Sequence, residues 1–283
     1  MQSLRETKEQ EDRTTKIGNY DFDLNKKTYV MGILNVTPDS FSDGGKWNAA
    51  DAALKHCEEM IRDGASIIDV GGESTRPGFQ PVPAEEEILR VVPVIERIKK
   101  EFDVPVSVDT MKAEVAKESL KAGCEIINDI WGLKKDPSMA KVIADANAFC
   151  VLMHNKDNTQ YNDLIPDVIS ELKECCEIAA AAGIAKEKII LDPGVGFGKD
   201  REQNLEVINR LEDFQTLGYP VLLGTSRKSV IGLTLDLPAD QRLEGTLVTT
   251  VMAVMKGISF VRVHDVKENM RAIRMTEAIL YGR

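Results

Sequence analysis

The chain has 283 residues, 43% of them hydrophobic and 29% charged, a composition typical of a globular protein rather than a disordered or membrane-spanning one. The net charge of −10 is not accompanied by any basic stripe, so we expect no nucleic-acid partner. No apolar run approaches the roughly 18 residues that a membrane helix needs, and no signal-peptide pattern opens the chain, so we expect no membrane partner and a cytoplasmic location.

The first 16 residues form a charged tail. Eight of them are charged and none is aromatic, which is typical of disorder, so we expect one domain to span residues 17–283. Residues 19–24 then alternate between polar and apolar side chains, and Asn25-Lys26-Lys27 follows them as a turn signal. This pattern predicts a small hairpin that closes the bottom of the domain.

Short β-branched runs then alternate with longer segments of helical periodicity. The alternation predicts parallel strands joined by crossover helices. The runs occur at residues 29–35, 66–71, 105–110, 125–130, 149–154, 188–192, 220–225 and 258–264. Eight such units are the number in an α/β TIM barrel, (β/α)8, and we expect this fold as a single domain. A doubly wound parallel sheet is the alternative.

The segments between the runs carry helix signals. Acids at residues 85–87 open one helix at its positive end, and bases at residues 99–100 close it. After the seventh run, Gly232 and Pro238 interrupt the chain before an apolar helix at residues 247–255. We therefore expect a short extra helix or a loop between that run and that helix.

Polar side chains stand at the C-terminal ends of six of the eight runs, where barrel enzymes build their active sites. A charged or amide side chain is costly to bury in a barrel interior unless it meets a partner. The residues concerned are Asn35, Asp69, Asp109, Asn128, Asp192, Arg262 and His264. Their common position predicts a binding site at this end of the barrel.

Arg262 and His264 lie two residues apart on the last run and therefore share a face. A guanidinium beside an imidazole suits an anion. Two alternatives stay open: Arg262 pairs with an inward acid such as Asp69, and His264 is a hydrogen-bonded core histidine.

Lys228 follows the seventh run, and barrels often bind phosphate with the loops after strands seven and eight. We therefore expect Lys228 and Arg262 to share one anion pocket. A solvated surface lysine is the alternative.

The glycine-rich stretch at residues 192–199 fits neither the Walker pattern nor the dinucleotide-binding pattern. Its glycines let the backbone lie close to a flat ligand, with Phe197 beside that ligand. Ordinary loop packing of Phe197 is the alternative.

Two loops rich in glycine, proline and small polar residues follow the first two runs, at residues 37–45 and 72–78. Such loops act as lids in many enzymes, and Arg76 with the loop hydroxyls would close over an anion. Surface loops without a function are the alternative.

Taken together, several segments resemble those of the dihydropteroate synthase family. They are residues 32–45, 69–78, 192–194, 197–199, 226–229 and 262–265, and the resemblance extends over residues 29–283. This family joins p-aminobenzoate to 6-hydroxymethyl-7,8-dihydropterin diphosphate in folate biosynthesis, with Mg2+ assisting and pyrophosphate released, and it is the target of sulfonamides. The resemblance implies a TIM-barrel transferase that forms a homodimer.

The resemblance also implies roles for single residues. It places the pterin diphosphate against Thr75, Asp109, Asn128, Asp192, Lys228, Arg262 and His264. It places p-aminobenzoate against Thr75, Arg76, Phe197, Lys228 and Ser229, and Mg2+ on Asn35. The residues expected to act in catalysis are Asp43, Asp109, Lys228, Arg262 and His264. If the C–O bond breaks before the amine attacks, the two acids stabilise the positive charge on the pterin methylene, while Mg2+, Arg262 and His264 stabilise the leaving diphosphate.

One stretch departs from the family pattern: residues 154–157 lack the glutamine or glycine that many relatives carry after this run. A pterin-binding methyltransferase barrel is the alternative function, and a non-catalytic pterin-binding homologue is a further one. The cluster of Lys228, Arg262 and His264 favours the synthase, because a methyltransferase has no reason to keep a diphosphate site.

Overall fold

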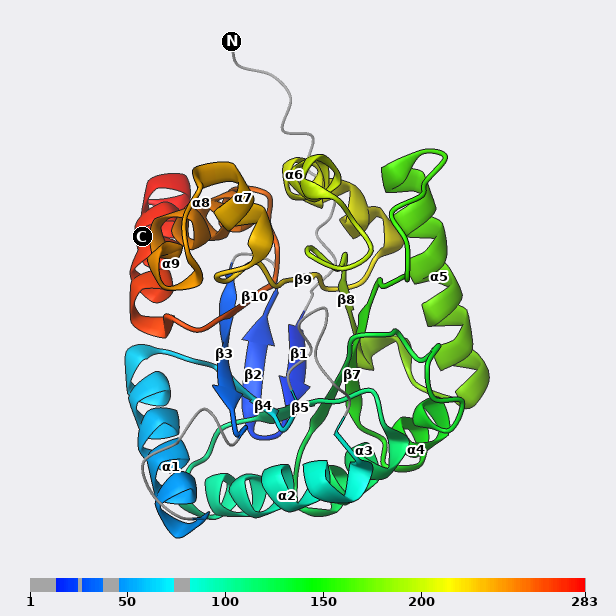
Figure 1. The fold of residues 1–283 in the computed structure, drawn as a ribbon, viewed down its shortest axis with the longest axis vertical. Helices are drawn as coiled ribbons and strands as arrows, with labels where there is room; N and C mark the ends of the chain where they lie inside the picture. Colours follow the sequence, from blue (N-terminus) through cyan, green and yellow to red (C-terminus); the bar gives the residue numbers. More distant parts are fainter. Residues whose placement is uncertain (1–13, 25–26, 38–45, 74–81, 283) are drawn as a thin grey trace.

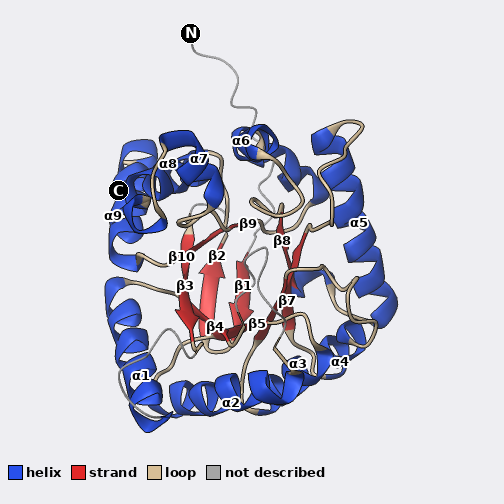
Figure 2. Cartoon of the chain, viewed as in Figure 1, coloured by secondary structure: helices blue, strands red, loops and turns tan. Residues whose placement is uncertain are grey.

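The computed structural model describes residues 14–24, 27–37, 46–73 and 82–282. Within these ranges an eight-stranded parallel sheet forms the inner wall of a barrel, and helices surround it (Figures 1 and 2). The strands are β3 (Tyr29–Asn35), β4 (Ile67–Gly71), β5 (Val106–Asp109), β6 (Ile126–Asp129), β7 (Phe149–Met153), β8 (Ile189–Asp192), β9 (Leu222–Leu223) and β10 (Phe260–Val263). The helices are α1 (Lys46–Asp63), α2 (Ala84–Glu101), α3 (Ala113–Lys121), α4 (Met139–Asp145), α5 (Leu164–Ala182), α6 (Arg201–Asn209), α7 (Ser229–Leu235), α8 (Leu243–Met255) and α9 (Val266–Tyr281).

The barrel closes between β8 and β9. The strand order is β8-β7-β6-β5-β4-β3-β10-β9, and a parallel bridge joins Leu191 to Val221. The backbone N–H of Leu191 also donates to the carbonyl oxygen of Pro220 at 2.9 Å. The predicted TIM barrel is therefore confirmed, and the doubly wound alternative is wrong. β9 is much shorter than the predicted run, and Pro220 has no N–H to extend its ladder.

A two-stranded hairpin covers the N-terminal end of the barrel, and Figure 1 shows it in blue across the middle of the ring of helices. Its strands are β1 (Thr14–Ile17) and β2 (Tyr20–Asp23). Ile17 and Phe22 are buried in one cluster with inward side chains of the barrel strands. These barrel residues are Met31, Ile67, Ile126, Val151, Ile190, Leu222 and Phe260. The predicted plug is confirmed, and it lies opposite the end where polar residues gather.

The hairpin begins earlier in the sequence than predicted. The turn is Gly18-Asn19, where Gly18 has φ of +59°, rather than residues 25–27. A two-residue hairpin turn requires this left-handed conformation, which glycine adopts without strain. Residues 14–16 consequently belong to β1 and not to a disordered tail, while residues 1–13 lie outside the described residues.

The segment after β9 holds the predicted extra helix. It is α7, and the 3-10 turn Ala239–Gln241 separates it from α8. α8 begins at Leu243, four residues before its predicted start. In the part of the chain that the structure describes, no helix has the length and apolar character needed to cross a membrane. The cytoplasmic location and the lack of a nucleic-acid partner stay predictions.

Candidate active site

The barrel interior changes from apolar to polar along its strands. Inward side chains near the N-terminal ends are hydrophobic, and the side chains two residues further along the same strands, on the same face, are charged or amide groups. The pairs are Ile67 and Asp69, Ile126 and Asn128, Ile190 and Asp192, and Phe260 and Arg262. The three polar residues on β4, β6 and β8 are each no more than 4% exposed. The strands therefore gather a buried polar cluster at their C-terminal ends.

Arg262 is the centre of this cluster. Its Nε donates to Oδ2 of Asp69 at 2.5 Å, and its Nη2 donates to Oδ2 of Asp109 at 2.6 Å. The Nδ2 of Asn128 donates to the same oxygen of Asp69 at 3.2 Å. The alternative that Arg262 pairs with Asp69 is therefore correct for this structure, and the pairing extends to a second acid. Nη1 of Arg262 makes no hydrogen bond within the described ranges, which leaves one face of the guanidinium for an anion.

Two carboxylate oxygens in the cluster are buried without a partner. They are Oδ1 of Asp69 and Oδ1 of Asp109, neither of which accepts a hydrogen bond from any described residue. Burial raises the pKa of Asp109, although the positive charge of Arg262 opposes the rise. A buried acceptor without a donor is unfavourable, so these oxygens favour a ligand that presents N–H groups.

Asp192, Lys228 and Arg262 converge on the space beside Gly224. A Cβ built on Gly224 would lie 3.6 Å from Oδ2 of Asp192, 3.7 Å from Nζ of Lys228 and 4.0 Å from Cβ of Arg262. Burial raises the pKa of Asp192, and the charge of Lys228 opposes the rise. A glycine at this position therefore keeps open a space lined by the carboxylate of Asp192 and the ammonium of Lys228.

Lys228 is held at the site rather than solvated. It is half-buried, and its Nζ donates to the carbonyl oxygen of Val195 at 2.5 Å and lies 4.6 Å from the centre of the Phe197 ring. Burial lowers the pKa of Lys228 to about 8. Lys228 and Arg262 thus lie close together beside Gly224, whereas the anion pocket stays a prediction, and Phe197 presents its ring to the ammonium.

His264 lies at the mouth of the barrel. Its Nδ1 is 3.0 Å from Oγ of Ser226, and its backbone N–H donates to the same oxygen at 3.2 Å. The ring is half-buried, so the alternative of a core histidine is wrong. Ser229 is exposed at the first residue of α7.

Asn35 is the residue predicted to bind a metal ion. It lies at the C-terminal end of β3, and a Cβ on Gly71 would approach its Oδ1 to 3.3 Å. Glycine at 71 therefore leaves the amide oxygen open toward Asp109. The described residues contain no group of three histidine, cysteine or acidic side chains that could hold a metal. Mg2+ typically binds through one protein oxygen together with phosphate oxygens and water, which this arrangement fits.

Three predicted site residues, Asp43, Thr75 and Arg76, lie outside the described residues.

Asp69 was predicted among the polar strand residues and as the inward acid that pairs with Arg262, but it was given no role toward a substrate. The structure places it in contact with both Arg262 and Asn128. A carboxylate between apolar neighbours in the middle of a buried run needs a partner, and this one is 0% exposed.

A second buried ion cluster was also missed. Lys112 donates to Glu87 of α2 at 2.5 Å and to Glu73 after β4. Glu87 lies in the first turn of α2, as predicted, but is only 1% exposed, so it acts inside the molecule as well as at the helix end. Its spacing from Val91 and Val94 places it on the apolar face, which was the available signal. Glu73 also accepts from the N–H of Val82 at 3.0 Å, so the cluster joins the two residues that flank 74–81.

Comparison with known proteins gives one consistent result. A family described as pterin binding enzyme matches residues 31–264. Dihydropteroate synthase of Clostridium beijerinckii is 61% identical over 266 residues, 94% of this chain and 99% of that protein. The solved dihydropteroate synthase of Clostridium difficile with pteroic acid has a TM-score of 0.89 at 54% identity, covering 93% and 100% of the two chains. That of Xanthomonas albilineans with 4-aminobenzoic acid has a TM-score of 0.90 at 39% identity, covering 96% and 99%.

Proposed function

This chain belongs to the pterin-binding enzymes and among them to the dihydropteroate synthases, and we propose that it condenses p-aminobenzoate with 6-hydroxymethyl-7,8-dihydropterin diphosphate. The products are 7,8-dihydropteroate and pyrophosphate, so the chain is a transferase of folate biosynthesis. The observation that supports this most directly is a buried acidic cluster beside Arg262 and Lys228 with two acceptor oxygens that have no donor among the described residues. One side of the site thus suits a pterin, and the other suits an anion.

Asp109, Asn128 and Asp192 recognise the pterin. The ring offers N–H donors, and Oδ1 of Asp109 is a buried acceptor that lacks one. Asn128 is fixed by its bond to Asp69, which leaves its Oδ1 for a further donor. A ring without these N–H groups would leave the acceptors unpaired, so the same residues provide specificity.

The reaction exchanges one bond at the pterin methylene carbon. The C–O bond to the diphosphate breaks, and the amine nitrogen of p-aminobenzoate forms a C–N bond and releases a proton. Arg262, through its Nη1, which has no partner among the described residues, and His264 stabilise the charge on the leaving diphosphate. Asp109, which accepts from Nη2 of Arg262, stabilises positive charge that develops on the methylene through its Oδ1. Asp43 is expected to assist it.

Phe197 and Lys228 form the p-aminobenzoate side of the site, with Ser229, Thr75 and Arg76. The ring of Phe197 and the stem of Lys228 provide an apolar surface, and the ammonium attracts the carboxylate. Sulfonamides are expected to compete with p-aminobenzoate at this surface. A pterin-binding methyltransferase, the alternative function, has no diphosphate substrate for Lys228 and Arg262 to bind.

The function is tested by measuring pyrophosphate release from purified protein with Mg2+. Release is expected only when the dihydropterin diphosphate and p-aminobenzoate are both present. A protein that releases no pyrophosphate with both substrates, or that releases it equally without p-aminobenzoate, is not a dihydropteroate synthase.

Mg2+ is proposed to bind to Oδ1 of Asn35 together with oxygens of the diphosphate. The open position of this oxygen beside Gly71 supports the assignment. Bound there, the ion would neutralise charge on the leaving group.

Asn35→Ala is expected to raise the Mg2+ concentration for half-maximal activity about tenfold, a loss of roughly 1.4 kcal/mol for one ligand contact. Asn35→Asp keeps an oxygen at the same place and is the matched control, which should retain the wild-type requirement. Titration of activity with Mg2+ measures both. An unchanged requirement in Asn35→Ala removes Asn35 from the metal site.

A homodimer is proposed on the exposed apolar face of α7, α8 and α9, which lie side by side in Figure 1. The exposed residues are Leu233, Leu235, Val248, Met255, Met275 and Ile279, between 48% and 71% exposed. Val248 and Met255 are seven residues apart, and Met275 and Ile279 are four apart, so each pair lies on one side of its helix. Exposed apolar side chains gathered on neighbouring helices are typical of an interaction site, and the family resemblance makes a second copy the expected partner.

Ile279→Glu is expected to convert the dimer to a monomer of 31.3 kDa, because it introduces a charge into the buried face of the interface. Leu89→Glu is the matched control, since Leu89 is 73% exposed on α2. Light scattering measures both masses. Dissociation by Leu89→Glu, or a monomeric wild-type protein, contradicts the proposed interface.

A further inference from the structure

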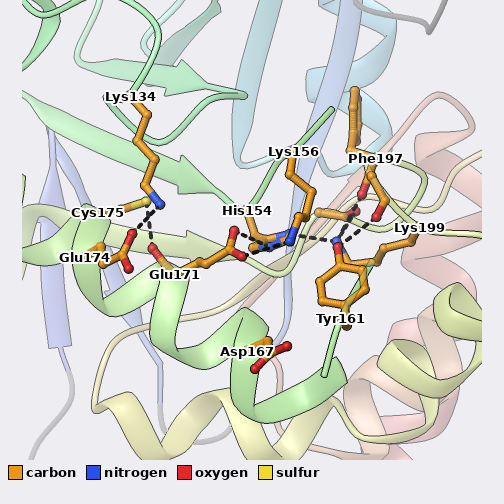
Figure 3. A network of polar contacts seen from close by, with 12 residues as sticks. Lys134, His154, Lys156, Tyr161, Asp167, Glu171, Glu174, Cys175, Phe197 and Lys199 are labelled. Carbon is orange, nitrogen blue, oxygen red and sulfur yellow. Dashed lines mark hydrogen bonds and ion pairs between the residues drawn. The ribbon is translucent and has the colours of Figure 1, made fainter. Parts of the chain in front are cut away.

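Lys199 belongs to the loop that joins β8 to α6, residues 193–200. Its side chain is buried against this loop, and the residue is 8% exposed. Its Nζ lies 2.8 Å from Nδ1 of His154 and donates to the carbonyl oxygens of Gly194 and Phe197, both at 3.1 Å (Figure 3). An ammonium carries three N–H donors. The three acceptors around Lys199 therefore use all of them.

His154 connects Lys199 to α5. The ring is 2% exposed, and its Nε2 lies 3.0 Å from Oε2 of Glu171. Burial, followed by the charge of Lys199, lowers the pKa of His154 to about 2, so the ring is neutral. Because Nδ1 faces an ammonium, Nε2 carries the ring proton. Nε2 makes no aligned hydrogen bond with any described residue, but the Glu171 carboxylate lies close to it, as Figure 3 shows. A neutral imidazole thus lies between a buried cation and an anion.

The loop backbone lies directly against the segment after β7. Gly194 has φ of +70°, and a Cβ there would stand 1.9 Å from the carbonyl oxygen of His154. The hydroxyl of Tyr161 donates to the carbonyl oxygen of Gly198 at 2.7 Å. The loop can approach this closely only with glycine at 194, so its position is fixed by contact as well as by hydrogen bonds.

The opposite side of the same loop faces the active site. Lys228 donates to the carbonyl oxygen of Val195 and lies against the ring of Phe197. Lys199 and Lys228 therefore hold neighbouring carbonyl groups of one loop from its two sides. A shift of the loop changes the positions of both Phe197 and Lys228.

We propose that Lys199, His154 and Glu171 form a loop clamp, which positions residues 193–199 so that Phe197 and Lys228 present a fixed surface to p-aminobenzoate. The three are positioning residues: Lys199 donates to the loop carbonyl groups, Nδ1 of His154 lies against its ammonium, and Glu171 holds a carboxylate 3.0 Å from Nε2 of His154. The inference rests on the proposed function for the identity of the substrate, whereas the order of the loop is a property of the protein alone.

Two pairs of variants test the clamp, each with a matched control nearby. Lys199→Met removes the ammonium with little change in shape, and its control is Lys134→Met, which breaks the ion pair of Lys134 with Glu174 at 2.9 Å. Glu171→Gln removes a carboxylate charge beside His154 and Lys199 and is expected to accelerate exchange of the loop amides less than Lys199→Met does. Its control is Glu174→Gln, one turn along α5, and no acceleration in Glu171→Gln removes Glu171 from the clamp. Burial lowers the pKa of Lys199 to about 7, so all measurements are made at about pH 6.5, where the ammonium form predominates.

A third pair separates hydrogen bonding from packing. In His154→Gln the amide oxygen can accept from Lys199, so the hydrogen bond that Nδ1 makes is retained. His154→Leu fills similar space and cannot make this bond. The clamp predicts that the loop stays ordered in His154→Gln and becomes less ordered in His154→Leu.

The first measurement is hydrogen exchange of the full-length protein without substrates. Backbone amides of residues 194–198 are expected to exchange about tenfold faster or more in Lys199→Met and His154→Leu, because the loop opens locally more often. Wild-type rates are expected in His154→Gln, Lys134→Met and Glu174→Gln. Unchanged exchange in Lys199→Met, or equal acceleration in both His154 variants, overturns the clamp. If Lys199→Met does not fold, the two His154 variants decide the question.

The second measurement is steady-state kinetics. The KM for p-aminobenzoate is expected to rise about tenfold or more in Lys199→Met, because a loosened loop misplaces Phe197 and Lys228. The KM for the pterin diphosphate should rise clearly less, because Lys228 contacts both substrates whereas Asp109, Asn128 and Asp192 lie on barrel strands and stay in place. Equal increases in both values indicate general damage and contradict the positioning role. A wild-type protein without synthase activity would refute the proposed function, whereas the exchange result would still decide the clamp.

Discussion

Arg262→Ala is expected to lower both the stability and the activity of the protein. The guanidinium contacts Asp69 at 2.5 Å and Asp109 at 2.6 Å, so its removal leaves two buried carboxylates without that partner. Breaking a buried ion pair typically lowers the free energy of unfolding by roughly 3–5 kcal/mol. The value of kcat/KM is expected to fall about a hundredfold or more, because a donor facing the leaving diphosphate is lost. Urea unfolding and steady-state kinetics measure the two effects.

The stability deficit of Arg262→Ala is expected to depend on pH. Burial already raises the pKa of Asp109, and losing the opposing charge of Arg262 raises it further. A carboxyl with a higher pKa in the folded state binds more protons there than in the unfolded state, so stability falls as pH rises between the two values. The deficit relative to the wild type should therefore be smaller at about pH 5 than at about pH 8. A deficit that stays constant over this range contradicts the role of the unpaired carboxylates.

Two further variants isolate the cause. Arg97→Ala removes a guanidinium that pairs with Asp51 at 2.6 Å on the surface of α2, and no measurable loss of stability is expected. Arg262→Lys keeps the charge without the planar fork, so it should recover much of the stability and little of the activity.

Much of the fold followed from local patterns in the chain. The run at residues 29–35 is found unchanged as β3, because a short continuous apolar run is typical of a strand buried on both faces of a parallel sheet. β9 departs furthest, since the predicted run at 220–225 begins with a proline and ends in the polar loop of the site. The hairpin was displaced because its true turn, Gly18-Asn19, lay inside the segment interpreted as tail and first strand.

The positions of the site residues followed from the barrel, whereas their contacts did not. Parallel strands bring their C-terminal ends together, so Asp109, Asn128, Asp192 and Arg262 were predictable as one group. The pairing of Arg262 with two acids at once depends on rotamers and on barrel closure, with partners 193 and 153 residues away in sequence. The role of Lys199 was hidden for the same reason, because its acceptors are mostly backbone oxygens of a loop.

Asp109→Asn is expected to remove most of the affinity for the pterin substrate while leaving the protein at least as stable. The amide oxygen still accepts from Arg262, but an N–H group replaces Oδ1, the buried acceptor without a partner among the described residues. N–H donors of the pterin then meet another donor, and affinity is expected to fall about a hundredfold or more. Calorimetry measures the affinity. Wild-type affinity in Asp109→Asn would contradict the role of Asp109 in recognition. Asp145→Asn on the surface of α4 is the control, and it should leave the affinity for the pterin substrate unchanged.

Stability provides a second test of the same carboxylate. Its raised pKa means that the charged form is disfavoured in the folded protein, so replacing the charge by an amide removes a destabilising group that the function requires. Arg262→Ala and Asp109→Asn should therefore shift thermal unfolding in different directions. The double variant should be more stable than Arg262→Ala alone, because one of the two unpaired charges is absent, and the two substitutions share one network and will not be additive. A double variant with the summed effects of the single ones would show that Arg262 and Asp109 act independently.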